Sequence, residues 1–350
     1  MRPRTILTAL GAVSLVGTAL SASPASAAPL DLIVQSVTFG RTKVAVAGLN
    51  TVAVPVTVKA TYKLGKPGQP LYAEFDNYDG DLPSRRVISE PLKLVEGTGK
   101  DGTWQGTVNV PSTADGNLTP TGVVAGIYTP TVGPNPNDSA PVSQMAPLVV
   151  TGLHTPKITR KLSANPVPFG KPYQITWQVL DSATGKPYGS RLKVVTNRKA
   201  DACLTAKGTT GAVQTNAAGV IVASYEAKDA DRLNCLLIPG TQAPIASHAA
   251  LVPRPGIVAA TPDRTSAKVG TTVPVKGNVA GITYDCPVNL QKLSGATQWR
   301  TLRSTRMSTT SRYTLGAPIT AKGKGTYRVQ FPACQNTLAG VSRTFSITGV

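Results

Sequence analysis

Histidine is scarce in this chain, and its scarcity excludes several kinds of catalytic site. The 350 residues include 2 histidines and 4 cysteines. Neither His154 nor His248 stands in a G-x-S-x-G or H-E-x-x-H motif. If the cysteines are paired, no free thiol is left for a Cys–His nucleophile. The sequence therefore predicts a protein that is not an enzyme, and it indicates no cofactor.

Long apolar runs are also missing. Residues 1–27 begin with Arg2 and Arg4, continue through an uncharged stretch and end in the small residues Ala25-Ser26-Ala27. This pattern predicts a secretory signal peptide that is cut after Ala27. A retained anchor would need about 20 consecutive apolar residues, and this stretch is shorter. The C-terminal "SRTFSITGV" has no hydrophobic tail or sorting signal. We expect a secreted, extracellular protein with no transmembrane segment.

Acidic residues become rare towards the C-terminus. Residues 28–152 hold 9 Lys and Arg against 10 Asp and Glu, residues 153–252 hold 12 against 5, and residues 253–350 hold 13 against 2, within a total of +19. Such a field favours anionic neighbours, such as teichoic acid, acidic polysaccharide, extracellular DNA or phospholipid head groups. It predicts an association with an anionic cell-wall polymer or polysaccharide and no specific nucleic acid.

No cysteine occurs before Cys203. An exported chain with an even number of cysteines is expected to form disulfides, and four cysteines allow three connectivities. The local pairing, Cys203 with Cys235 and Cys286 with Cys334, keeps each bridge within one domain. The alternative, a metal site, lacks a C-x-x-C pair and a neighbouring histidine.

Sustained helical periodicity is absent after the signal peptide, and short alternating runs take its place. Examples are "VAVPVTVKATY", "YQITWQVL", "TVPVKGNVA" and "TYRVQF". Period-two alternation between turn residues indicates half-buried strands. With 29 prolines and 33 glycines, long helices are disfavoured. The sequence predicts an all-β protein.

An internal repeat suggests three domains. The segment from Leu162 aligns with the segment from Pro262, so that Gly170 and Gly270 fall 100 residues apart. A looser copy surrounds Gly48. This period suits an immunoglobulin-like sandwich and exceeds that of a solenoid. We expect immunoglobulin-like domains over 28–152, 153–252 and 253–350, after the signal peptide 1–27. Short linkers near 151–158 and 251–258 favour a semi-rigid rod.

The third unit carries a family resemblance. Its "KVGTTVPVKGNV", "CPVNLQKL", "WRTLRS" and "GKGTYRVQFPAC" resemble secreted actinobacterial proteins built of tandem bacterial Ig-like domains. The family pattern has Gly before the tyrosine of "RYTL", where this chain has Ser311-Arg312. The resemblance implies a β-sandwich and an extracellular location. It implies no reaction, because such modules are spacers, adhesins and accessory domains.

The densest acidic cluster, "YAEFDNYDGDLPSRR", spans residues 72–86. Its carboxylates, Glu74, Asp76, Asp79 and Asp81, are oxygen ligands that suit calcium. The spacing departs from D-x-[DN]-x-[DN]-G, and a solvated turn explains the same residues. A calcium-dependent adhesive domain is therefore one alternative function.

Tryptophan occurs once per unit. Trp177 shares its parity with apolar neighbours and is predicted to be in the core, whereas Trp104 and Trp299 are less determined. A carbohydrate-binding or enzyme-accessory module would need these rings to be exposed in a row.

The segment "WRTLRSTR" concentrates arginines beside Trp299. As one regular strand it would place Arg300 and Arg306 on one face and Arg303 on the other. Only a bulge would let both Trp299 and Leu302 face the core. Together with Arg312, these arginines are candidate polyanion contacts. The leading hypothesis is a non-catalytic secreted protein that associates electrostatically with the cell envelope or an extracellular polyanion.

Overall fold

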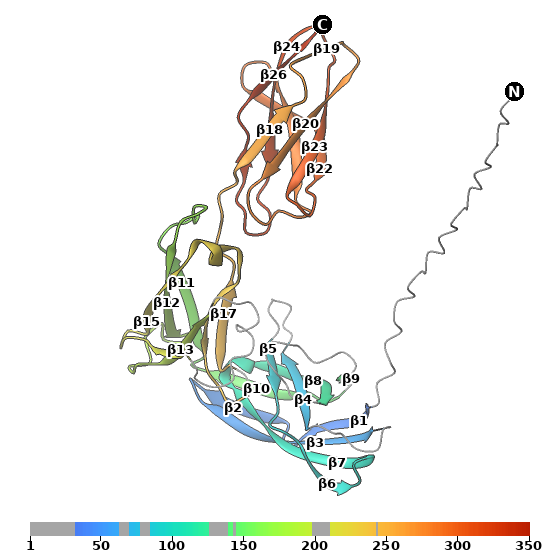
Figure 1. The fold of residues 1–350 in the computed structure, drawn as a ribbon. Coiled ribbons are helices and arrows are strands. Elements are labelled where there is room, and N and C mark those ends of the chain that lie inside the picture. The colour runs from blue at the N-terminus through green and yellow to red at the C-terminus, as the bar shows by residue number, and fades with distance from the viewer. Residues whose placement is uncertain are drawn as a thin grey trace, which may run out of the picture.

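The protein is built almost entirely of β-strands, as Figure 1 shows. The computed structural model describes residues 32–62, 70–77, 85–125, 139–142, 145–197, 211–242 and 244–350. The predicted signal peptide lies outside these residues. Within them, no helix is long and apolar enough to cross a membrane. The predicted all-β class is confirmed.

The first sandwich comprises strands β1 to β10 and the short helix η1. Their bounds are β1 Leu32–Phe39, β2 Lys43–Ala47, β3 Thr51–Tyr62, β4 Leu71–Asn77, β5 Arg85–Ile88, β6 Lys93–Gly97, β7 Asp101–Pro111, η1 Ser112–Ala114, β8 Gly116–Ala125, β9 Ser139–Pro141 and β10 Leu148–Leu153. One sheet has the order β1-β3-β7-β6 and the other β2-β10-β8-β4-β5, with β9 beside β8.

The second sandwich comprises strands β11 to β17 and the short helix η3. Their bounds are β11 Pro156–Leu162, β12 Tyr173–Asp181, β13 Lys193–Asn197, β14 Val213–Gln214, β15 Val220–Tyr225, η3 Ala227–Asp231, β16 Asn234–Ile238 and β17 Ala246–Ala250. The sheets have the orders β11-β12-β15 and β14-β13-β16-β17.

The third sandwich comprises strands β18 to β26. Their bounds are β18 Val258–Pro262, β19 Ser266–Ala267, β20 Thr272–Val279, β21 Pro287–Ser294, β22 Gln298–Arg306, β23 Arg312–Pro318, β24 Gly323–Phe331, β25 Gly340–Val341 and β26 Phe345–Gly349. The sheets have the orders β18-β20-β23 and β19-β26-β24-β21-β22, with β25 beside β24.

The three sandwiches share a common strand order. One sheet contains β1-β3-β7 in the first sandwich, β11-β12-β15 in the second and β18-β20-β23 in the third. The other sheet contains β10-β8-β4, β17-β16-β13 and β26-β24-β21, respectively. In the first and third sandwiches a short strand also pairs in parallel with the last strand, β2 with β10 and β19 with β26. This arrangement of two Greek-key sheets is the immunoglobulin-like sandwich, so the predicted fold class is confirmed.

Each sandwich has its own apolar core, which the alternation of its strands produces. Along β12, Tyr173, Ile175, Trp177 and Val179 are buried while the intervening side chains are more exposed. Alternate side chains of a strand point to opposite faces, so one face of each sheet supplies the core. Three separate clusters of buried side chains result, one per sandwich.

The connection between the second and third sandwiches is tied to both. The main chain of Arg254 hydrogen-bonds to the third sandwich, with its N–H on Asn336 O at 2.7 Å. Its guanidinium reaches the second sandwich, where Nη1 donates to Val167 O at 3.2 Å and to Pro168 O at 3.1 Å. Arg254 therefore bridges the two units, with its main chain bound to the third sandwich and its buried side chain bound to the second.

Candidate functional site

The two carboxylates of the third sandwich are already paired. Residues 253–350 contain 13 Lys and Arg, and the acids are Asp263 and Asp285. Asp263 lies 3.2 Å from Lys276 Nζ, and Asp285 lies 2.9 Å from Arg306 Nη1. Exposed ion pairs are worth about 0–1 kcal/mol. Two acids against 13 basic residues offset only a small part of the positive field.

The arginine-rich strand β22 is bulged. Its register with β21 shifts between two pairs, Leu290 with Arg303 and Gln291 with Thr301, so Leu302 is the extra residue. Leu302 is half-buried and packs against the core. The regular alternation considered from the sequence is therefore wrong for this strand. A bulge is present, but it brings only Leu302 to the core and leaves Trp299 outside it. A bulge adds one residue to one strand of a pair and re-aims the side chains around it.

An open hollow of about 930 Å³ lies on the third sandwich, over the outer face of the sheet β18-β20-β23 and beside the turn after β22. Its lining includes the cationic side chains of Lys276, Arg306 and Arg312 and contains no Asp or Glu. Thus Arg306 and Arg312, two of the four predicted contacts, share one site. Arg300 and Arg303 do not line it.

The floor of the hollow follows from strand register. Thr261 of β18 pairs with Lys276 of β20, which pairs with Thr314 of β23. Two residues along, Asn278 pairs with Arg312. Side chains directly opposite one another in antiparallel strands stand on the same face, with Cβ atoms about 5 Å apart. The register therefore presents these polar and cationic groups together on the outer face.

The wall of the hollow is the turn from Met307 to Ser311. Ser308 Oγ accepts from Arg312 N at 3.1 Å and contacts Thr310 Oγ1 at 3.1 Å. Ser311 has φ +56°, a conformation that favours glycine, and its Oγ donates to Gly281 O at 3.1 Å. The departure of this chain from the family pattern at Ser311 thus places a hydroxyl in a left-handed position. The turn holds Arg312 at the start of β23.

Tyr313 supports the floor from the core side. Its ring is buried, and its hydroxyl donates to Ala259 O at 2.7 Å across the intervening strand. Burial raises the pKa of Tyr313. A Cβ at Gly277 would lie 1.9 Å from Ala259 O and 2.4 Å from the Tyr313 hydroxyl. Only glycine at position 277 leaves room for the Tyr313 hydroxyl to cross β20 and reach Ala259 O on β18.

Sequence reasoning missed Lys276, Asn278, Thr261 and Thr314. The alternation in "TVPVKGNVA" places Lys276 and Asn278 opposite the buried valines Val273, Val275 and Val279. That signal could have assigned both residues to an outer face. The alternation does not show which strands pair with this one, so the proximity of Lys276 and Asn278 to Arg312 could not be predicted from the sequence.

The outer face of the other sheet carries a hydrogen-bonded row of side chains. Arg328 Nε donates to Gln291 Oε1 at 2.8 Å, and Gln291 Nε2 donates to Gln330 Oε1 at 3.0 Å. The Arg328 guanidinium also lies 4.2 Å from the centroid of Trp299. Trp299 is thus half-buried against Arg328 and is not part of the core cluster.

The tryptophans do not form an exposed row. Trp177 is 0% exposed, which confirms its predicted core position, and Trp104 is 3% exposed. A buried ring cannot stack on a sugar, so the carbohydrate-binding alternative loses two of the three side chains on which it depended.

The predicted calcium ligands are described only in part. Glu74 and Asp76 lie on β4, whereas Asp79 and Asp81 fall outside the described residues. Burial raises the pKa of Glu74, Arg86 at 3.5 Å opposes this shift, and Asp76 adds to it. Among the described residues no group of three or more potential metal ligands is present. The calcium site stays a prediction.

One of the predicted disulfides is present. Cys286 and Cys334 are bonded, with Cα atoms 5.9 Å apart, and the bridge lies within the third sandwich. Cys203 falls outside the described residues, so its pairing with Cys235 stays a prediction. Cys235 itself is not free.

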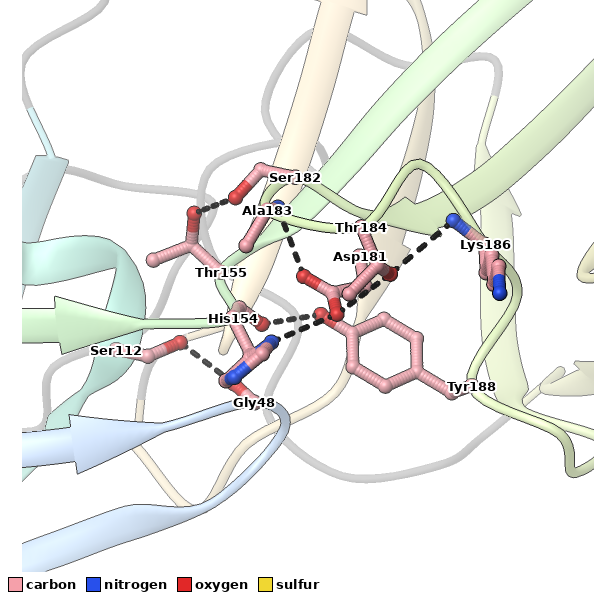
Figure 2. Close-up of polar contacts among 10 residues, drawn as sticks. All are labelled: Gly48, Ser112, His154, Thr155, Asp181, Ser182, Ala183, Thr184, Lys186 and Tyr188. Atoms are coloured by element: carbon pink, nitrogen blue, oxygen red, sulfur yellow. Dashed lines mark hydrogen bonds and ion pairs between the residues drawn. The ribbon is translucent and has the colours of Figure 1, made fainter.

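His154 lies at the joint between the first and second sandwiches (Figure 2). Its Nδ1 is 2.8 Å from Asp181 Oδ2, and its carbonyl accepts from the Tyr188 hydroxyl at 2.6 Å. Desolvation acts to raise the pKa of Asp181, but hydrogen bonds from His154, Ala183 and Thr184 outweigh it and lower that pKa. In the described part of the chain, no hydroxyl or thiol is hydrogen-bonded to Nε2 of His154. The pair therefore resembles a structural tie more than a nucleophile–base couple.

No family model matches the chain, and no curated protein matches it. Among solved structures, it is similar to a tetra-tandem repeat in the extending region of a large adhesion protein, with 12% identity, a TM-score of 0.30, and coverage of 87% of this chain and 74% of that one. It is also similar to the D0-D1 domain of intimin, with 12% identity, a TM-score of 0.21, and coverage of 55% and 97%. A third similarity, to the D00-D0 domain of intimin, has 13% identity, a TM-score of 0.23, and coverage of 55% and 100%. The strand order and pairing of the sandwiches are those of the immunoglobulin-like fold.

Proposed function

We propose that this chain is a non-catalytic, secreted protein of tandem immunoglobulin-like sandwiches, which associates electrostatically with an anionic polymer of the cell envelope or with an extracellular polysaccharide. The observation that carries the proposal is the charge of the third sandwich. Its two carboxylates are already paired with Lys276 and Arg306. Its other lysines and arginines, Arg254 apart, have no carboxylate partner among the described residues.

The distribution of charge along the chain supports attachment through one end. Residues 28–152 hold 9 basic and 10 acidic residues, whereas residues 253–350 hold 13 and 2. A field of one sign attracts a polymer of the opposite sign and raises the rate of encounter. The third sandwich would thus contact the polymer while the first sandwich adds no net attraction.

The experiment measures binding of the purified protein to immobilised poly(glycerol phosphate), a teichoic-acid backbone, over a range of NaCl concentrations. Screening between exposed charges is nearly complete at about 1 M salt, where the Debye length is about 3 Å. We expect binding at low salt that weakens steadily and is lost by about 1 M NaCl. A neutral dextran surface is the control and should retain no protein at any salt concentration.

Retention on poly(glycerol phosphate) that persists unchanged at molar salt would contradict an electrostatic association. Absence of binding at low salt would contradict it equally, because the field is least screened there.

Calcium-dependent adhesion through residues 72–86 is a second proposal, supported by one observation. Asp76 Oδ1 is buried and has no hydrogen-bond partner among the described residues, which leaves a hard oxygen available to a cation. Calcium should raise the unfolding temperature of the parent protein, and an Asp79→Asn/Asp81→Asn variant should lose that increase. A parent protein whose unfolding temperature does not respond to calcium would end this proposal.

A further inference from the structure

We infer that the hollow lined by Lys276, Arg306 and Arg312 is a binding site for the phosphate groups of a phosphodiester-linked polymer. This inference rests on the proposed function and deepens it. It assigns the attraction to one locus and one chemical group, whereas the proposed function requires only the field of the whole sandwich.

The cationic groups converge on the hollow from different elements. Lys276 comes from β20 and Arg312 from β23, and register places them one row apart on the same face. Arg306 ends β22 in the other sheet and reaches the same hollow past the turn. Diagonal neighbours on paired antiparallel strands are about 7–8 Å apart, so a ligand that spans the hollow can contact more than one cation.

The uncharged lining consists largely of hydrogen-bonding groups. Besides the three cations it includes side chains of Thr261, Asn278, Ser308, Thr310 and Thr314. A phosphodiester has two charged oxygens and two ester oxygens around a tetrahedral phosphorus, so donors can approach it from several directions, whereas a carboxylate presents its two oxygens in one plane. The donor set therefore favours phosphate over the carboxylate of an acidic polysaccharide.

Nucleic acid also carries phosphodiesters, but the hollow does not suit it. Proteins that bind single strands stack bases on exposed aromatic rings. Tyr313 is the aromatic residue in the lining, and it is 5% exposed. A polyol or sugar phosphate, which has no base to stack, fits this surface better.

Two of the cations form ion pairs with nearby carboxylates, which would compete with a phosphate for them. Asp263 holds Lys276, and Asp285 holds Arg306, in pairs whose members are all at least one-third exposed. Such pairs are readily exchanged. Arg312 has no ion-pair partner among the described residues, so it is the cation most available to an incoming phosphate.

The test compares variants of equal net charge in the full chain. Arg312→Gln removes a charge inside the hollow, and Arg303→Gln removes one outside it. We expect Arg312→Gln to weaken binding to poly(glycerol phosphate) about tenfold, the effect of losing one charge-assisted hydrogen bond. Arg303→Gln should weaken it less than about threefold, as expected from the field alone.

A second pair of variants tests the hollow by gain of binding. Asp263→Asn frees Lys276 and should strengthen binding about threefold or more. Asp101→Asn makes the same change of charge in the first sandwich and should have little effect. A variant that unfolds at the same temperature as the parent protein cannot gain binding through loss of structure, so this pair keeps the test decisive even if Arg312→Gln is unstable.

Equal losses in Arg312→Gln and Arg303→Gln would overturn the inference and leave the proposed function intact. Failure of the parent protein to bind at all would overturn both. Polygalacturonate and duplex DNA complete the comparison. Tighter binding to either of them than to poly(glycerol phosphate) would overturn the choice of a polyol or sugar phosphate.

Discussion

The guanidinium of Arg254 lies 4.0 Å from the ring centroid of Phe169, so a residue at the start of the third sandwich stacks on a side chain of the second. Arg254 also donates two hydrogen bonds to carbonyls of the second sandwich. The side chain is buried, and this contact couples the two units.

Replacing Arg254 should therefore loosen the joint. Arg254→Ala removes two charge-assisted hydrogen bonds, and we expect a loss of about 2 kcal/mol or more in the free energy of unfolding. Denaturant unfolding measures the loss, and X-ray scattering of the full chain should show a broader range of shapes. Arg264→Ala, at an exposed position, is the control and should change stability by less than about 0.5 kcal/mol. Equal effects of the two variants would refute the coupling.

The Cys286–Cys334 bridge should stabilise the third sandwich. It closes a loop with a sequence separation of 48 residues, for which the chain-entropy model gives about 4 kcal/mol. A Cys286→Ala/Cys334→Ala variant should unfold at a clearly lower temperature than the oxidised parent. The reductant-treated parent should resemble the variant. If oxidised and reduced protein unfold at the same temperature, the bridge does not contribute as expected.

Gly277 and Tyr313 should differ in what they contribute beneath the hollow. Gly277→Ala forces a Cβ against Ala259 O and the Tyr313 hydroxyl, and we expect a cost of about 1–3 kcal/mol from overpacking. Tyr313→Phe loses one hydrogen bond, at about 1 kcal/mol. Calorimetric unfolding distinguishes the two.

Gly316 provides the matched control for this comparison. It lies on the neighbouring strand β23, and a Cβ there would meet the movable methyl group of Thr272 at 2.7 Å. Gly316→Ala should therefore cost less than Gly277→Ala. The reverse order would show that the approach of Tyr313 does not depend on glycine.

His248 should make stability fall in mildly acidic solution. Burial lowers its pKa from 6.5, and Arg160 lowers it further. Between the folded pKa and 6.5 the unfolded chain binds more protons, so the free energy of unfolding decreases as the pH falls below about 6.5. His248→Gln should show a smaller decrease between about pH 7 and pH 5.

Asp181 provides the contrast for this pH dependence. Because its pKa is lowered, its contribution is full above about pH 4 and is lost as the pH falls through its folded pKa. Asp181→Asn should therefore alter the profile only at lower pH. Parallel profiles for the parent protein and His248→Gln from pH 7 to pH 5 would contradict the assignment to His248.

The all-β class was predictable because strand alternation is a local property. Trp177 could be assigned to the core from its parity with three apolar neighbours, and its burial confirms that assignment. The repeat of about 100 residues likewise predicted the immunoglobulin-like unit, and the same strand order recurs in all three sandwiches. These features depend on the spacing of residues along the chain, which can be read directly from the sequence.

The bulge at Leu302 shows where local spacing fails. The alternation of residues within "WRTLRSTR" does not depend on the partner strand, whereas the register shift arises in the pairing of β22 with β21. The bulge could therefore not be predicted from this segment alone. Packing Leu302 onto the core compensates for the interrupted ladder, and that gain exists only when both sheets are present.

The sequence by itself determined the class of fold and the concentration of positive charge in residues 253–350, and it predicted the Cys286–Cys334 pairing that the structure confirms. Only the tertiary structure decided which cations act together. Lys276 and Arg312 are far apart in the sequence and meet because β20 and β23 pair in antiparallel register, while Arg303 stays outside the hollow. The net charge can be counted from the residues alone, whereas the distances between cationic side chains depend on which strands pair.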